Sequence, residues 1–407
     1  PSMISPTETS PEKSKSALPS GDKLSDALRQ ITTGWLSKIE LAKQAKKHFD
    51  EVGEQCTAFF QASVSFMWEP DFRRKFLGTD ISPNFHVTLN KAFELVSIYG
   101  PTLYWQNPQR VLQARKHLPV IPEMFGVDQQ LQQQLQQQSQ QLQQQMQSFN
   151  QRSARANLMQ NWLNYTPSEQ PGGGLETHAM KAITESLVKG RGCLMPEAYT
   201  MPGSETKLTG CTYISVDDLF LDPDATGLGP NECWWMAVKR VQPVWYVERK
   251  FGLEGKLQSS ATHERKSSFG ERMNRDLGNN DQAMGKTHDT ITYYEIWSKS
   301  GAGHRLAGLR SEYHDAFEKV GDYVRLVVSP GVDYPLNAPP SKIKKASQKE
   351  IAKMLEWQYP FWKDGRWPVV CLDYWHRVPD DKPQSSAWPI APLEPGLGEL
   401  ITLNVIV

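Results

Sequence analysis

The chain has 407 residues, with 45 basic and 45 acidic side chains and 39% hydrophobic residues. The zero net charge excludes the excess of Lys and Arg that sequence-independent wrapping of nucleic acid requires. The length predicts two or three domains, at about 150 residues each.

Five widely spaced cysteines, never in a C-x-x-C pair, indicate reduced thiols and neither a disulfide framework nor a zinc site. Residues 1–20 are rich in Ser, Pro and Lys, so we expect a disordered arm and no secretory signal. No apolar run is long enough to cross a bilayer, and we expect no membrane partner.

The first half of the chain predicts helices. Apolar residues at helical spacing over 22–52 predict an amphipathic helix. A second helix, predicted over 84–97, precedes the aromatic-rich stretch 99–108, which a Gly-Pro and an Asn-Pro pair punctuate. We interpret that stretch as a packed aromatic turn.

Residues 129–151 are mostly glutamine and carry no charge. Leu135, Leu142 and Phe149 repeat every seven residues, which is typical of a helix or a weak coiled coil. A helical hairpin arm or a polar disordered insert explains this composition equally well, so these alternatives stay open.

The middle of the chain changes from helix to strand. The triple glycine 172–174 indicates a flexible linker, because no Lys-Ser or Lys-Thr follows it as in a phosphate-binding loop. A helix is predicted over 175–189, followed by strands over 193–199, 212–216 and 234–241.

Residues 256–288 are polar and rich in Gly and Asn, which indicates an exposed connection. Strands are predicted over 290–298 and 323–328, a Lys-rich helix over 341–357, and a buried strand over 367–375. The whole pattern predicts an α+β fold.

One acidic segment contains a metal-like pattern. A calcium loop that begins at Asp222 would place oxygen ligands at its first, third and fifth positions, but Cys233 occupies the twelfth position, where Glu is required. We favour a turn in which Asp222 and Asp224 bond their own backbone amides. The nearby Asp217 and Asp218 complete the candidate carboxylate group.

A basic segment is the best candidate for contact with DNA. Its five ammonium groups lie at helical spacing, although a solvated helix face explains them equally simply. The residues are Lys342, Lys344, Lys345, Lys349 and Lys353. The sequence contains no H-E-x-x-H, G-x-S-x-G or complete dinucleotide-binding motif, so we assign no catalytic residue, no metal and no cofactor.

Several segments, taken in order, resemble the portal proteins of tailed bacteriophages. They are Ser186–Leu194, Ile214–Ala225, Trp234–Arg240, Pro243–Gly252, Ile291–Trp297 and Trp388–Leu400, of which the last is the most specific. The resemblance covers the chain from about residue 84 onwards, while the N-terminal arm and the Gln tract depart from it. Its structural motif residues are Gly190, Gly192, Asp222, Pro223, Trp388, Pro389, Pro395, Gly396 and Gly398.

The resemblance implies an elongated subunit with an α/β wing, a helical stem and a β-containing clip. The implied boundaries are a wing at 21–241, with the Gln-rich insert 129–151, a first stem helix and polar connection at 242–287, a clip at 288–340, a second stem and return to the wing at 341–387, and the start of the tunnel helix at 388–407. We expect the rest of that helix and a crown to lie beyond Val407, in a longer polypeptide.

The resemblance also implies a function without catalysis. Such a subunit forms a ring, expected to be a dodecamer, at one capsid vertex of the virion, and it assembles in the host cytoplasm. Double-stranded DNA passes through its channel, and its partners are the terminase packaging motor, the major capsid protein and the neck or tail adaptor proteins. Two alternatives stay open: a nucleic-acid-processing enzyme or accessory subunit that uses Asp217–Asp224, and a scaffold or internal core protein.

Overall fold

The computed structural model describes residues 22–69, 74, 78, 88–113, 151–200, 207–229, 231–253, 255, 257–259, 289–303, 321–343, 346, 348–357, 366–377 and 387–406. The chain divides into two compact units. Unit 1 combines Pro1–Val96, Glu185–Cys193 and Ile214–Val407, and unit 2 combines Ser97–Thr184 and Leu194–Tyr213. The fold is a mixed α+β fold with two antiparallel sheets, as the sequence predicts.

A four-stranded antiparallel sheet forms the centre of unit 1. Its strands lie in the order β3 (Leu219–Leu221), β4 (Trp235–Pro243), β5 (Thr290–Ser298) and β6 (Val324–Val328). Val, Ile, Tyr and Trp dominate the two central strands, and such residues pack well on a pleated surface. Eight of the nine residues of β5 are buried, because both faces of the sheet are covered.

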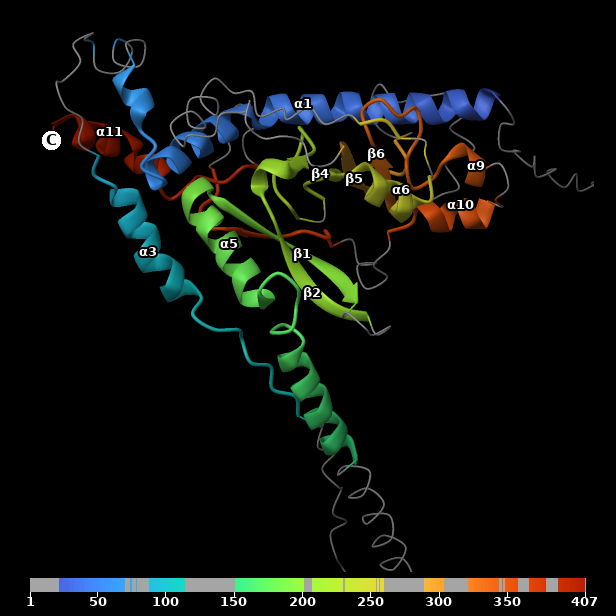
Figure 1. Cartoon of the computed structure of the whole chain (residues 1–407), viewed down its shortest axis with the longest axis horizontal. Coiled ribbons are helices and arrows are strands. Elements are labelled where there is room, and N and C mark those ends of the chain that lie inside the picture. The colour runs from blue at the N-terminus through green and yellow to red at the C-terminus, as the bar shows by residue number, and fades with distance from the viewer. Residues whose placement is uncertain are drawn as a thin grey trace, which may run out of the picture. The chain divides into compact units, whose positions relative to one another are not determined.

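The helix α1 (Asp22–Phe60) covers one face of this sheet (Figure 1). Its apolar stripe includes Leu28, Trp35 and Ile39, which repeat at the helical period and are at most 1% exposed. The Trp35 ring meets Trp235 of β4 edge to face, with 5.6 Å between the ring centroids. Its indole N–H donates to the carbonyl of Ala302 at 2.9 Å, so burial leaves this donor satisfied.

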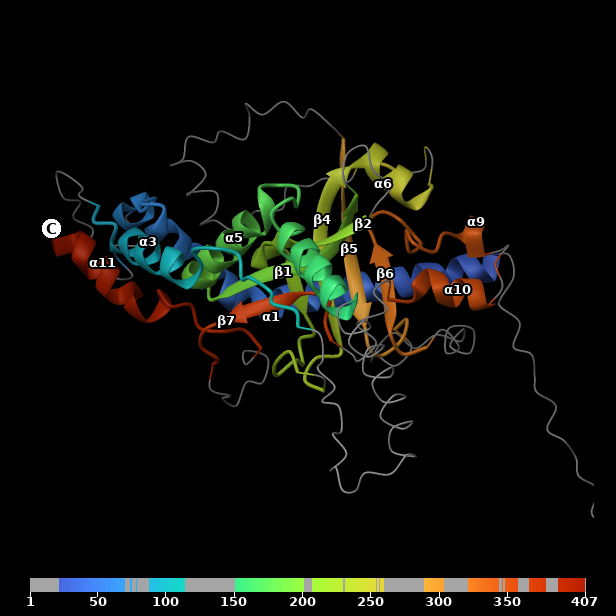
Figure 2. The same ribbon diagram turned by 90° about the horizontal axis from the view of Figure 1, so that it is seen from below.

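The helix α6 (Val244–Phe251) packs on the opposite face of the sheet. Val247 and Phe251 form a second core cluster there with Ile291 and Tyr293 of β5. The helix begins directly after β4 and lies next to the end of that strand (Figure 2). It ends at Gly252, whose φ of 66° supplies the left-handed C-terminal cap that glycine adopts readily.

The remaining elements are shorter. They are η1 (Ser65–Trp68), α3 (Lys91–Leu103), a helix over 151–165, α5 (Gly174–Lys189), η2 (Val216–Asp218), α9 (Pro340–Ile343), α10 (Gln348–Leu355), η5 (Glu394–Gly396) and α11 (Leu397–Ile406). A second sheet has the strand order β2-β1-β7, with β1 at Arg191–Thr200, β2 at Lys207–Ile214 and β7 at Val370–Asp373. Within the described ranges, no helix is long and apolar enough to cross a bilayer.

Several predicted elements are confirmed. The helix predicted over 22–52 is α1 and continues to Phe60, and the helix predicted over 175–189 is α5. The predicted strands correspond to β1, β2, β4, β5 and β6, although β2 begins and ends before the predicted range. The arm 1–20 and most of the Gln tract 129–151 and of the connection 256–288 lie outside the described residues.

Three expectations differ from the structure. The Gly-Pro pair at 100–101 does not end a helix, because α3 continues through Pro101 to Leu103. The buried strand predicted over 367–375 is the four-residue β7 at the edge of its sheet, and its residues alternate between exposed and half-buried. The Lys-rich segment 341–357 contains two short helices, α9 and α10.

One sheet contains strands from both the expected wing and the expected clip. The strand β5, which was expected to begin the clip, pairs with β4 along its whole length, from Pro243 opposite Thr290 to Trp235 opposite Ser298. β4 belongs almost entirely to the expected wing. These two strands and β6 therefore form one continuous layer of unit 1.

Candidate functional site

Arg191, the first residue of β1, forms a buried junction with the segment that begins at Ala387. Its guanidinium donates to both carboxylate oxygens of Asp373 at 2.8 and 2.7 Å, and to the carbonyl of Ala387 at 3.0 Å. It also lies over the Trp388 ring, 5.2 Å from the ring centroid. The Arg191 side chain is only 2% exposed, and these contacts replace part of the water that it loses, while its Nη1 is buried without a hydrogen-bond partner.

The charge of Arg191 is retained in this junction. Burial alone would lower the pKa of the guanidinium, but the hydrogen bonds and the charge of Asp373 raise it above its usual value. A planar, permanently charged fork suits the carboxylate of Asp373 better than an ammonium group would.

Gly190 is required where the start of β1 meets the segment that follows Trp388. It has a φ of 97°, and an added Cβ would lie 3.0 Å from the backbone nitrogen of Ala391 and 3.1 Å from the carbonyl carbon of Ile390. A side chain there would be strained and would press on backbone atoms that cannot move aside. The sequence-predicted motif residues Gly190 and Trp388 therefore lie together, almost 200 positions apart along the chain.

A second polar cluster adjoins Trp388. The Lys46 side chain of α1 is fully buried, with its ammonium 5.3 Å from the Trp388 ring centroid. The ammonium donates to the carbonyls of Val216 and Asp217 at 2.7 and 3.0 Å and lies 3.2 Å from the carboxylate of Asp50. Burial raises the pKa of Asp50 to about 6, although Lys46 opposes this shift.

Asp217, one of the candidate metal-binding carboxylates, is paired with a lysine. Its Oδ2 accepts from the ammonium of Lys189 at 2.6 Å, and the same ammonium lies 3.6 Å from Glu185. Glu185 in turn accepts from the Ser215 hydroxyl at 2.7 Å and from the amide of Val216 at 2.9 Å. Burial raises the pKa of Glu185. The cluster therefore connects the end of α5 to η2 and its N-cap, Ser215.

Asp222 lies in a turn. Its carboxylate accepts from the amide of Asp224 at 3.3 Å, its carbonyl accepts from the amide of Ala225 at 2.9 Å, and Pro223 occupies the corner. Burial raises the pKa of Asp222. Among the described residues, no group of three or more His, Cys, Asp or Glu side chains is placed to hold a metal ion. The contacts of Asp222 match the turn interpretation.

A cavity of about 980 Å³ lies beside this turn. Its lining combines Asp222 and Glu232 with Lys38, Lys299 and the half-exposed Trp234. Glu232 accepts from the amide of Gly229 at 2.7 Å, so this carboxylate closes its own loop. The carboxylates of Asp222 and Glu232 therefore already accept from amides of the local backbone.

The basic segment is divided between two helices. Lys342 of α9 donates to the carbonyl of Phe251 at 2.7 Å, which satisfies a free carbonyl at the end of α6. Lys353 is exposed on α10, and Lys349 belongs to the same helix. Lys344 and Lys345 lie outside the described residues.

The other motif residues flank the start of the last helix. Pro395 and Gly396 belong to η5, and Gly398 lies in the first turn of α11. Arg377 holds the start of η5, because it donates to both carboxylate oxygens of Glu394 at 2.7 and 2.9 Å. Gly192 is buried in β1, and Pro389 follows Trp388 in the junction.

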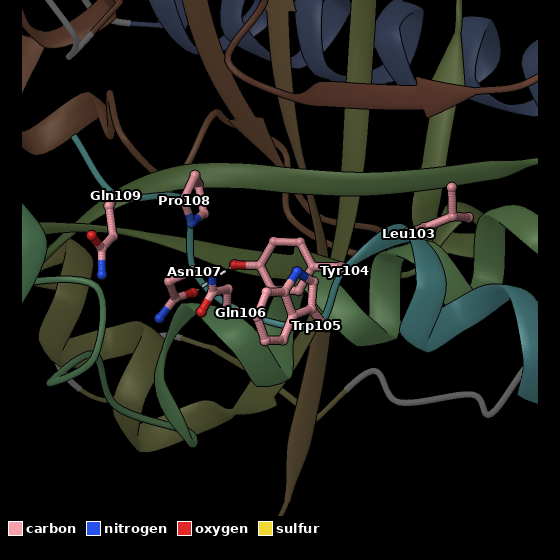
Figure 3. Close-up of a pocket in the computed structure, with 7 residues that line it drawn as sticks. All are labelled: Leu103, Tyr104, Trp105, Gln106, Asn107, Pro108 and Gln109. Atoms are coloured by element: carbon pink, nitrogen blue, oxygen red, sulfur yellow. Dashed lines mark hydrogen bonds between the residues drawn. The ribbon is translucent and has the colours of Figure 1, made fainter. Parts of the chain in front are cut away.

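Unit 2 exposes several large apolar side chains that the sequence did not predict to be exposed. The stretch expected to be a packed aromatic turn exposes Tyr99 and Trp105, by 53% and 74%. Figure 3 shows Trp105 in the wall of a shallow pocket of about 410 Å³ formed by Leu103–Gln109, where the Tyr104 hydroxyl donates to Asn107 at 2.5 Å. We give the name apolar edge to the large, exposed apolar residues of unit 2, which are Ile98, Tyr99, Leu103, Trp105, Val111, Leu158, Met159, Trp162 and Tyr165.

Comparison with known proteins identifies no family. No protein-family model matches the chain. No curated protein matches it either.

Proposed function

We propose that this chain is the portal subunit of a tailed bacteriophage. In this proposal, copies of the chain form a ring, of twelve subunits, at one capsid vertex of the virion. DNA enters and leaves through the ring, which binds the terminase motor during packaging and the neck or tail adaptor proteins afterwards. The proposal assigns the chain no catalytic residue and no cofactor.

The observation that carries the proposal is the junction between Gly190–Arg191 and Trp388. These residues belong to two of the segments that resemble portal proteins. Chance matches between short segments would not need to meet in the fold, whereas these two share the contact of Arg191 with the Trp388 ring and a glycine-dependent backbone approach. Their association supports the interpretation that both segments are parts of one inherited structural unit.

The charge of the chain also suits this function. A ring that conducts DNA must attract the phosphates weakly enough for the duplex to slide, and a strongly basic wall would retain it. The zero net charge is compatible with that weak interaction. The continuous sheet formed by β4, β5 and β6 would make the expected wing and the first part of the expected clip a single rigid layer.

Light scattering coupled to size-exclusion chromatography tests the assembly. We expect a species whose mass is a fixed, large multiple of the chain mass, and a monomer at every concentration and salt concentration would contradict the proposal. The enzyme alternative is tested in the same preparation by incubation with DNA and Mg²⁺ or Mn²⁺. A nuclease activity that the double variant Asp222→Asn/Asp224→Asn abolishes would replace the portal proposal.

A further inference from the structure

The two helices of the apolar edge present their large side chains outwards. Gly100 is buried in α3, where an added Cβ would meet the methyl group of Met180 at 3.8 Å, whereas Ile98, Tyr99 and Leu103 are about half exposed. The exposed side of α3 carries the charged pair Lys91 and Glu94 in its first half, and the three apolar side chains follow in its second half.

The helix over 151–165 shows the same feature more strongly. None of its fifteen residues is buried, and Leu158, Trp162 and Tyr165 lie at the i, i+4 and i+7 spacing that places them on one face. Its described tertiary contacts are few: the segment 110–112 makes hydrogen bonds to its last two turns, among them Arg110 to the carbonyl of Leu163 at 2.9 Å.

The extent of the apolar edge matches that of a subunit interface. An aromatic side chain has a surface of about 200 Å² and an aliphatic one about 100 Å², so the exposed fractions leave about 750 Å² of apolar surface. A stable interface buries about 800 Å² on each partner. Tyr, Trp and Met, which are enriched in interface cores, make up five of the nine residues.

From these observations we infer that the apolar edge of unit 2 packs against a second copy of this chain, and that it is one of the two faces through which the ring closes. This inference rests on the proposed function, because a closed ring of identical subunits requires two different complementary faces on each subunit. Trp105 and Trp162 are its aromatic anchors, since they carry large apolar surfaces from two separate segments to the same edge.

Paired tryptophan variants test this inference. The double variant Trp105→Gln/Trp162→Gln removes both anchors, and Trp245→Gln is the matched control, because Trp245 is 57% exposed but lies on α6 of unit 1. Mass photometry over a concentration series measures self-association. We expect wild type and Trp245→Gln to associate equally and the double variant at least about tenfold more weakly, since buried aromatic anchors dominate interface energies.

A labelling experiment keeps the inference testable if the double variant does not fold. The thiol of Trp105→Cys should react with a maleimide in dilute monomer and be protected in the assembled species, as read by peptide mass spectrometry. Protection in the monomer would mean that another segment of the same chain covers the edge, and reaction in the assembly would mean that nothing covers it; either result overturns the inference.

The outcomes also separate the inference from the proposed function. If wild type assembles and the double variant assembles as well as wild type, the inference fails and the portal proposal stands. If Trp245→Gln weakens assembly as much as the double variant does, apolar exposure in general and not the apolar edge drives association, and the inference fails. A wild-type chain that never assembles contradicts both.

Discussion

Replacement of Arg191 by Met tests the buried junction. Methionine keeps most of the methylene chain of the arginine side chain but lacks the guanidinium. The carboxylate of Asp373, whose side chain is only 9% exposed, therefore loses its main partner. Removal of one partner from a buried ion pair costs about 3–5 kcal/mol, because the remaining charge stays desolvated. We therefore expect Arg191→Met to lower the free energy of unfolding of unit 1 by about that amount.

Arg377→Met is the matched control, because Arg377 also donates to both oxygens of a carboxylate, Glu394. Both side chains of that pair are 20% exposed, so water can solvate the remaining charge and the expected loss is about 1 kcal/mol. Urea unfolding followed by tryptophan fluorescence measures both losses. Replacing the whole buried pair, in Arg191→Met/Asp373→Leu, should recover much of the first loss. Equal losses for the two single variants would refute the reasoning.

Three further predictions concern the same unit. Gly190→Ala should destabilise the chain by more than about 1 kcal/mol, because Gly190 has a positive φ and lies against the backbone of Ile390 and Ala391. Gly398 is its control, since it lies in a helix with open space around it, and Gly398→Ala should be neutral or slightly stabilising in the same urea assay. The sulfur atoms of Cys193 and Cys371 lie 3.8 Å apart on the neighbouring strands β1 and β7. Treatment with diamide should therefore join these thiols in a disulfide, which mass spectrometry would detect as one crosslinked peptide pair. Two unlinked peptides would contradict the pairing of β1 with β7. Because burial raises the pKa of Asp50 to about 6, folding favours its protonated form, so this group's stabilising contribution is complete below pH 4 and is lost as the pH rises through 6. Asp50→Asn should therefore gain stability relative to wild type over that range, and a constant difference would contradict the assignment.

The elements with strong local patterns were predictable from the sequence. The apolar stripe that begins at Leu24 marks α1, and β-branched and aromatic runs mark β4, β5 and β6. The helix α3 was predicted to end too early, because the Gly-Pro pair is a strong local stop signal. Pro101 removes one N–H and its ring crowds the preceding turn, but only two residues of the helix follow it, and Tyr104 still donates to the carbonyl of Gly100 at 3.2 Å.

Long-range pairing was not predictable. β4 and β5 are separated by about 46 residues, and nothing in either strand specifies its partner. The motif residues Gly190 and Trp388 were selected by resemblance, but Asp373, which completes their junction, carries no local signal. The apolar edge was missed because an aromatic stretch has the same composition whether it packs within the subunit or against another one.

Image reconstruction of the purified protein by single-particle electron microscopy tests the central claim most directly. The portal proposal predicts closed rings of a single symmetry, with an axial channel wide enough for double-stranded DNA and with unit 2 of each subunit in contact with a neighbour. Isolated subunits under all assembly conditions, or open filaments without a channel, would contradict it.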